Sequence, residues 1–424
     1  MGSTEWYNIL FDIGKIFFQV LLVGIFAYYL LISAFAWRRK KEASTEEFPI
    51  KNRFAMLVAA HNEEAVIPAI IKSLKALKYP KNMYDIFIIA DNCTDTTANV
   101  AKEHGVKVFE RFDSVKKGKG NALEWMFKKL SDMKEKYDGV CIFDADNLIS
   151  PNFLLEMNKQ MCLGHKVVQG YLDSKNPSDT WISGNNSIAF WISNRMLQLP
   201  RYYLGLSCIL GGTGFMLATE IIEKVGWKAT CLTEDLEFSL KLVLKNYKIY
   251  WAHDAVIYDE KPLTLKQSWR QRKRWMQGHF DCVGRFFVPM FKKALKEKSL
   301  TAFDCCMYLL QPITAVINGL LMVAGFVFLT VNIISGVAKT WGFANISIIV
   351  LTYLLMYLGT FFVAIEGKVK PKVLFHLFLL PFYNLTWVPI VILGFINRDK
   401  KDWVHTLHTR VIDMSDLQKL EKVG

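Results

Sequence analysis

Apolar and amphipathic runs alternate in a repeated order between residues 52 and 172. Five short apolar runs predict strands: RFAMLVAA, DIFIIA, VKVFE, GVCIF and KVVQGY. The segments that begin at Glu64, Thr94, Gly120 and Pro151 predict the helices between them. This order is typical of βαβ units, so we expect an α/β domain around a mainly parallel sheet.

A long apolar segment precedes this domain. Residues 16–36 carry no charge and are long enough to span a bilayer. The basic run RRKK at 38–41 follows at once, which by the positive-inside rule predicts a cytosolic domain downstream. In a cleaved signal peptide the charge would come before the apolar core, so the order here indicates an anchor instead.

Three further apolar segments follow the domain, at about 313–335, 346–365 and 373–397. The first two are predicted spans, and a basic loop after the second marks a cytosolic return. Pro381 and Pro389 interrupt the third, and a basic stretch follows it. A broken or re-entrant element would keep that basic tail in the cytosol, and this is the prediction we make.

Composition supports a membrane protein with one domain outside the bilayer. Apolar residues make up 52% of the 424 positions, and much of the net charge of +13 lies beside the apolar segments. That distribution favours membrane topology over nucleic-acid binding. The eight cysteines show no C-x-x-C pair, which argues against a zinc site or a disulfide framework and favours a reducing compartment.

Polar loops follow three of the predicted strands, as HNEE, DNCTDTT and DADN. Ligands of such sheets bind beyond the carboxyl ends of the strands, so these loops should share one crevice. Asp144 and Asp146 are spaced to hold a divalent cation that binds a diphosphate, although a solvated turn has the same pattern. Asp91 could accept from a nucleobase, lie near the metal, or cap the next helix.

Two other stretches carry candidate chemistry. The segment KGKGNAL at 117–123 could approach phosphates, but it lacks the P-loop spacing, so an ATPase is excluded. Glu234 and Asp235 begin an amphipathic helix, either as helix-dipole partners or as a general base for an attacking hydroxyl.

The sequence QRKRW at 271–275 joins basic residues to an aromatic one. Taken alone, it fits nucleic acid, an acidic membrane surface or a phosphate site. Its position after TED and before the predicted spans argues against nucleic acid. We expect a helix on the membrane surface with some of these side chains facing the site.

The ordered set A-A-H-N-E-E, D-N-C-T-D, G-K-G-N-A-L, D-A-D, T-E-D and Q-R-K-R-W resembles the membrane-integrated family 2 glycosyltransferases. These include the cellulose, chitin, hyaluronan and poly-N-acetylglucosamine synthases. The resemblance covers about residues 15–410. It implies an α/β fold of the GT-A (Rossmann-like) class and an inverting transfer from a UDP-sugar.

The resemblance also implies residue roles. At the donor, Ala60, Glu63 and Asp91 would line the uridine, and Lys119 would approach the nucleotide. Asp144 and Asp146 would hold the diphosphate through Mg2+ or Mn2+, with Asp146 the more direct ligand. Gln271, Arg272 and Arg274 would bind UDP. Asp235 would be the catalytic base, beside Glu234. At the acceptor the implied residues are Trp275, Gly212 and Thr213, and a gating role falls to Thr406 and Arg410. Leu210 and Gly211 depart from the pattern that cellulose synthases usually have here, which leaves acceptor and linkage open.

The predicted function is a processive inverting β-glycosyltransferase in a bacterial-type plasma membrane, with its catalytic domain in the cytosol. It would polymerise glucose from UDP-glucose into a mixed-linkage or cellulose-type glucan and translocate it, with membrane lipids as further partners. Alternatives are a poly-N-acetylglucosamine, chitin or hyaluronan synthase, a non-processive lipid glucosyltransferase like glucosylceramide synthase, and a non-enzymatic channel or surface-binding protein. The predicted parts are an anchor at 1–41, a catalytic domain at 42–260, interfacial helices at 261–300, a transmembrane region at 301–398 and a gating-like tail at 399–424.

Overall fold

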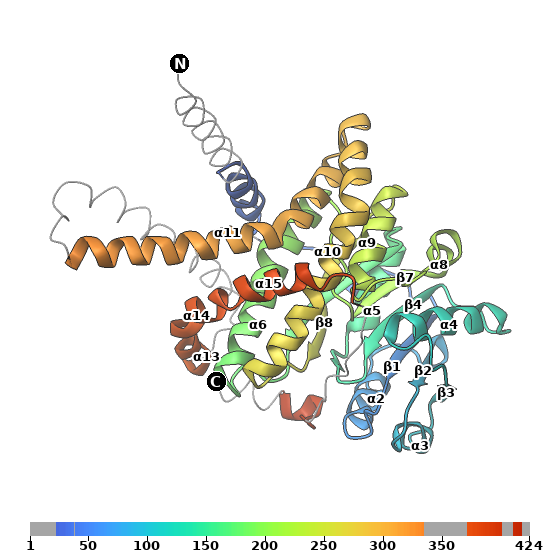
Figure 1. Ribbon diagram of the computed structural model, residues 1–424. Helices are drawn as coiled ribbons and strands as arrows, with labels where there is room; N and C mark the ends of the chain where they lie inside the picture. The colour runs from blue at the N-terminus through green and yellow to red at the C-terminus, as the bar shows by residue number, and fades with distance from the viewer. Residues whose placement is uncertain (1–22, 38, 335–370, 401–409, 418–424) are drawn as a thin grey trace.

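The computed structural model describes residues 23–37, 39–334, 371–400 and 410–417 (Figure 1). Its centre is one mixed eight-stranded sheet with the strand order β3-β2-β1-β4-β7-β6-β8-β5. The strands are β1 Phe54–Ala60, β2 Tyr84–Asp91, β3 Lys107–Arg111, β4 Gly139–Asp144, β5 Leu148–Ile149, β6 Val167–Ser174, β7 Phe215–Ala218 and β8 Tyr250–Asp259.

The first half of the sheet is parallel and consists of β1 to β4. Each of the strand pairs β1–β2, β1–β4 and β2–β3 runs parallel, and the strands coincide with the predicted apolar runs. Ala60 pairs with Ala90, and Ala59 pairs with Asp144, so the polar loops after β1, β2 and β4 leave the same edge. The predicted crevice therefore has a structural basis in the register of these strands.

The second half of the sheet is mixed. Strand β7 runs antiparallel to β4 and to β6, whereas β6 and β8 are parallel and β5 pairs antiparallel with β8. Of these strands only β6 was predicted. The backbone of β7 enters the sheet beside β4, which brings the loop before it, with Gly212 and Thr213, next to the end of β4.

Helices cover both faces of the sheet. The helices that accompany the strands are α2 Ile67–Lys75, α3 Thr97–Glu103, α4 Lys119–Asp132, α5 Phe153–Cys162, α6 Trp181–Ser193, α7 Leu199–Tyr203, α8 Thr219–Val225 and α9 Glu234–Leu244. Buried side chains of α2, α3 and α5 pack against one face, and those of α4, α6, α8 and α9 pack against the other. Because alternate residues of β1 enter each of these two cores, the strand is buried on both sides.

The described residues after β8 add long and short helices to this domain. They are α10 Leu265–Lys296, α11 Leu300–Ile334, α13 Pro371–His376, α14 Leu380–Leu385 and α15 Trp387–Ile396. Thr264 begins α10 with a capping box to Gln267. Helix α15 packs against both α10 and α11. The predicted interruption of the last apolar segment is observed, because α13, α14 and α15 are separate short helices.

Two stretches, Leu300–Ile317 and Leu377–Ile396, are long and apolar enough to cross a membrane, judged by length and composition. A shorter apolar helix covers Val23–Ala34. The predicted span at 346–365 lies outside the described residues. The region at 180–200 contains α6, whose largely buried residues pack against β6 and also against α13 and α14.

Candidate functional site

A single cavity of about 750 Å³ begins at the carboxyl ends of β1, β2 and β4 and continues beneath α10. Most of the residues implied by the resemblance line it: Ala60, Glu63, Asp91, Lys119, Asp144, Asp146, Gly212, Thr213, Glu234, Asp235, Gln271, Arg274 and Trp275. Its far end lies between α6, α10, α11, α14 and α15. The structure thus brings segments more than 200 residues apart to one space.

Asp91 lies buried at the end of β2. Its carboxylate accepts from the guanidinium of Arg111 and, at 3.3 Å, from the backbone N–H of Gly118. It therefore holds the loop before α4 as well as facing the cavity. It does not cap α3, because the side chain of Asp95 accepts from the backbone N–H of Thr97 at 3.0 Å.

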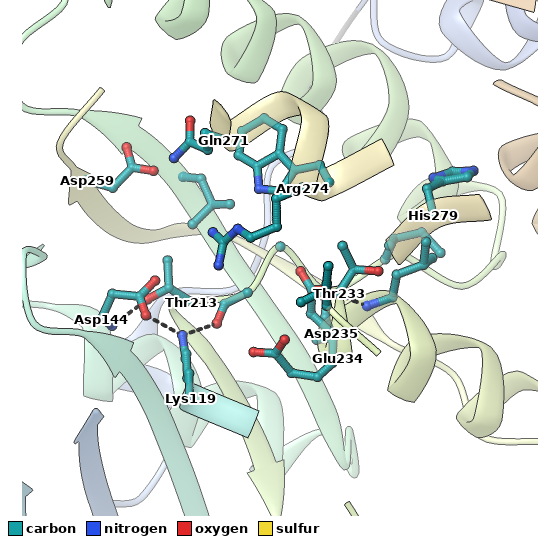
Figure 2. A pocket seen from close by; sticks show the side chains of 18 of the residues that line it. Lys119, Asp144, Thr213, Thr233, Glu234, Asp235, Asp259, Gln271, Arg274 and His279 are labelled. Carbon is teal, nitrogen blue, oxygen red and sulfur yellow. Dashed lines mark hydrogen bonds and ion pairs between the residues drawn. The ribbon is translucent and has the colours of Figure 1, made fainter. Parts of the chain in front are cut away.

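Lys119 is the first residue of α4 and reaches across the cavity (Figure 2). Its Nζ donates to Oδ1 of Asp144 at 2.5 Å and to the carbonyl of Gly212 at 2.6 Å. Gly118 precedes it with a φ of +95°, a conformation that favours glycine. The ammonium thus links the strand-end carboxylate to the loop before β7.

Three carboxylates gather at the ends of β4 and β8. Asp144 ends β4 and Asp146 follows it, and Oδ2 of Asp146 accepts from the backbone N–H of Glu260 at 2.9 Å. Burial raises the pKa of the Asp259 carboxyl; Lys261 opposes this shift, and the charges of Asp146 and Asp144 add to it. Negative charge is therefore concentrated at this place, as a cation site requires.

The same carboxylates fit a divalent cation bound together with a diphosphate. Within the described part of the chain, no group of three or more His, Cys, Asp or Glu side chains is arranged to hold a metal by itself. Mg2+ is commonly held by one or two carboxylates, with water and substrate phosphates completing its octahedron. Asp144 and Asp146 match that donor set.

Glu234 and Asp235 begin α9 on the opposite wall of the cavity (Figure 2). Burial, and then the charge of Asp235, raises the pKa of Glu234 to about 7. Burial also raises the pKa of Asp235, whereas a hydrogen bond of 2.8 Å from the backbone N–H of Leu236 lowers it. Lys119 and Arg274 lower both pKa values, so the two cations face this carboxylate pair across the cavity.

Helix α10 turns only part of QRKRW toward the cavity. Gln271, Arg274 and Trp275 line it, as residues spaced by three and four on one helix face should. The ring of Trp275 meets Phe190 of α6 edge-on, with centroids 6.1 Å apart. Lys273, which was not expected in the site, is not among the lining residues.

Arg272 does not line the cavity, so the structure does not bring it together with the other residues implied at the donor. It is fully buried on the neighbouring face of α10, where its guanidinium lies 4.4 Å from the ring centroid of Tyr383 and 4.9 Å from that of Trp387. Its Nη1 donates to Oγ1 of Thr386 at 2.9 Å. The position of residue 272 on α10 directs its side chain toward the residues that join α14 to α15.

The C-terminal tail reaches the rim of the cavity. The backbone N–H of Arg410 donates to Glu260, a lining residue, at 3.2 Å, and its guanidinium donates to Asp179 at 3.2 Å. Arg410 itself does not line the cavity. Thr406 lies outside the described residues.

Sequence reasoning missed several residues of the lining. They are Asp259 at the end of β8, His279 on α10, Tyr308 and Gln311 on α11, and Tyr383 on α14. Asp259 carries the signal that identified Asp144, an acidic residue after an apolar run, and could have been found by it. The others lie on apolar helices whose packing partners no local pattern specifies.

Comparisons with known proteins agree with this architecture. A family model described as glycosyltransferase-like family 2 matches residues 52–278. "Probable glycosyltransferase YdaM" of Bacillus subtilis is 28% identical over 317 residues, covering 71% of each chain. The poly-β-1,6-N-acetyl-D-glucosamine synthase of Staphylococcus epidermidis is 26% identical over 395 residues, covering 90% of this chain and 92% of the relative.

Other relatives differ in their named product. The β-monoglucosyldiacylglycerol synthase of Nostoc sp. is 28% identical over 284 residues, covering 63% of this chain and 58% of the relative. Among solved structures, a mannosyltransferase from Pyrobaculum calidifontis, in complex with GDP-Man and Mn2+, superposes with a TM-score of 0.58 at 15% identity, covering 90% of this chain and 97% of that one. The expectation of a GT-A-class α/β fold is confirmed.

Proposed function

Because the chain belongs to glycosyltransferase family 2, we propose that its cavity transfers a sugar from a UDP-sugar to a hydroxyl group of an acceptor. The observation that carries this proposal is the position of Asp235, which faces Lys119 and Arg274 across a single cavity. A base for the acceptor and cations for the leaving group are therefore within one site.

The reaction requires only a displacement. Asp235 takes the proton of the acceptor hydroxyl, whose oxygen attacks the anomeric carbon as the bond to the UDP oxygen breaks. Lys119 and Arg274 balance the charge that develops on UDP. Attack from the face opposite to UDP inverts the anomeric centre, and no covalent enzyme intermediate is needed.

Asp144 and Asp146 would hold a Mg2+ or Mn2+ ion, which when bound neutralises diphosphate charge as a Lewis acid. The proximity of Asp259 supports this: its pKa is raised first by burial, and the charges of Asp146 and Asp144 add to the shift. Ala60, Glu63 and Asp91 would surround the uridine, and Gln271 would lie near the diphosphate. The Mn2+ in the mannosyltransferase complex is consistent with this donor set.

For the acceptor we propose a growing polysaccharide. The supporting observation is the depth of the cavity, which passes Trp275, Gly212 and Thr213 and continues between α10, α11 and α15. A relative that matches over 90% of this chain and 92% of its own length is named a poly-β-1,6-N-acetyl-D-glucosamine synthase, which makes N-acetylglucosamine the first sugar to test. Glucose as the donor sugar and a mixed-linkage glucan as the product stay predictions from the sequence. Translocation, the gating role of the tail and the domain boundaries also stay predictions.

A second candidate is transfer of one sugar to a lipid. It is favoured by the apolar helices around the far end of the cavity and by the relatives named β-monoglucosyldiacylglycerol synthase. In both cases the protein would work in a membrane, with Leu300–Ile317 and Leu377–Ile396 as spans and the basic residues after the N-terminal apolar helix on the cytosolic side.

The test uses purified full-length protein with Mg2+ and radiolabelled UDP-N-acetylglucosamine or UDP-glucose. Label retained in precipitated, glycosidase-sensitive polymer supports a polysaccharide synthase, whereas label extracted into organic solvent supports the lipid reaction. Asp235→Asn should lower the rate about 100- to 10,000-fold. Asp132→Asn, an exposed carboxylate at the end of α4, is the matched control. Absence of transfer from either donor, or full activity of Asp235→Asn, would sink the proposal.

A further inference from the structure

His279 occupies a particular place at the deep end of the cavity. It lies one turn beyond Trp275 on α10, and only 6% of its surface is exposed. Its ring lines the cavity beside Tyr308, with the two ring centroids 5.7 Å apart. Figure 2 shows it on the other side of Glu234 and Asp235 from Lys119 and Asp144, away from the proposed phosphate site.

One nitrogen of this imidazole has a defined partner. Nε2 lies 3.1 Å from the backbone carbonyl of Leu309 on α11. Leu309 lies in the turn of α11 that precedes Pro312. A carbonyl oxygen only accepts, so Nε2 must carry the proton.

The other nitrogen is then an acceptor. Burial lowers the pKa of His279 to about 4, so the ring is neutral at pH 7 and Nδ1 keeps a free lone pair. Within the described part of the chain Nδ1 has no hydrogen-bond partner, and it is not one of the polar side-chain atoms that are both unpaired and fully buried. It is therefore open to the cavity that the ring lines.

We propose that His279 is a specificity-determining residue that accepts a hydrogen bond from an acceptor hydroxyl through Nδ1 and so orients the acceptor toward Asp235. This inference rests on the proposed transferase function. The backbone carbonyl of Leu309 selects the tautomer, and α10 holds Trp275 and the imidazole on the same wall. A hydroxyl-bearing acceptor, whether a sugar chain or a glycerol lipid, has the donor that this wall requires.

Two substitutions test the roles of Nε2 and Nδ1 separately. The amide of glutamine reaches the position of Nε2, so His279→Gln can keep a donor to Leu309 while removing the acceptor. The amide of asparagine reaches the position of Nδ1, so His279→Asn keeps a polar atom in the cavity and loses the bond to Leu309. His104→Gln, at the end of α3 and outside the cavity, is the control.

The measurement is initial rate against concentration of two acceptor probes, a soluble β-1,6-linked N-acetylglucosamine oligosaccharide and dioctanoylglycerol, with UDP release without acceptor recorded in parallel. We expect His279→Gln to raise the acceptor KM about 3- to 10-fold, the value of one hydrogen bond, with kcat and donor KM nearly unchanged. His279→Asn should melt at a lower temperature with a smaller change in acceptor KM.

The reverse order, with His279→Gln like the wild type and His279→Asn impaired, would mean that the imidazole only holds α11, and it would overturn the inference. So would an equal loss of acceptor transfer, acceptor-free UDP release and thermal stability in His279→Gln. If the wild type itself transfers to neither probe and releases no UDP, the proposed function fails instead, and the two failures are thereby distinguished.

Discussion

Two glycines on α10 provide a matched test of how this helix positions Asp235, the proposed catalytic base. A Cβ added at Gly278 would lie 2.4 Å from Oγ1 and 2.8 Å from the backbone nitrogen of Thr233, the residue before Glu234. A Cβ at Gly284, six residues further along the same helix, would meet nothing within 4 Å. Substitution by alanine at the two positions therefore differs mainly in what the methyl group touches.

The magnitude follows from these distances. Ordinary contact begins at 3.4 Å, so Gly278→Ala must separate α10 from Thr233 by about 0.6 to 1 Å. Overpacking of this kind destabilises by about 1–3 kcal/mol, against a helix-propensity gain of about 1 kcal/mol. Gly284→Ala has the gain alone, so it should be the more stable variant by about 1–3 kcal/mol.

The effect on activity should be larger than the effect on stability. Displacement of catalytic groups by about 1 Å can lower a rate about 100-fold, and Thr233 leads directly into Asp235. We expect Gly278→Ala to fold but to lose most transferase activity, and Gly284→Ala to keep it. Denaturant unfolding in detergent and initial rates measure both. Equal stability and equal rates in the two variants would refute the close packing of α10 on the start of α9.

Other predictions concern single charged groups. Arg272→Met should unfold at about the same free energy as the wild type and keep its activity, because a buried cation with no acidic partner among the described residues is replaceable by an apolar chain. Arg272→Lys should instead destabilise by about 1–3 kcal/mol. Loss of activity in the Met variant alone would support the donor-site role. The pKa of Glu234 is raised in the folded state, so the folded protein binds the extra proton and stability should fall as pH rises from about 4.5 to 7. Glu234→Gln should flatten that slope in melting curves, and an unchanged slope would contradict the shift. Lys119→Met should bind Mn2+ more tightly in the absence of donor, by electron paramagnetic resonance titration, because its ammonium competes for Asp144; weaker binding would contradict this competition.

Much of the catalytic half was predictable because it is built from local patterns. Apolar runs identified β1 to β4, and parallel pairing brings their polar ends to one edge, so Asp91 and Asp144 could be expected together before any contact was known. Strands β7 and β8 were missed because their pairing joins residues far apart in the chain. The mixed half of the sheet depends on these long-range pairs.

The position of Arg272 could not be read from the sequence for a related reason. Sequence proximity to Arg274 suggested a shared role, but consecutive positions on a helix point in directions about 100° apart, and the two arginines therefore contact different elements. Which face meets the cavity depends on α14 and α15, more than a hundred residues later. His279 escaped notice in the same way, because its tautomer depends on a carbonyl of α11.

Helix α10 both lines the cavity and packs against the apolar helices α11 and α15. One face holds Gln271, Arg274 and Trp275 at the cavity, and Gly278 lies against Thr233 at the start of α9. Other positions of the same helix are bound to α11 and to the break between α14 and α15. A helix of this length shifts largely as a unit, so a displacement of the apolar helices would move the groups around the donor and the base together. The catalytic geometry is thus a property of the domain and the apolar helices combined.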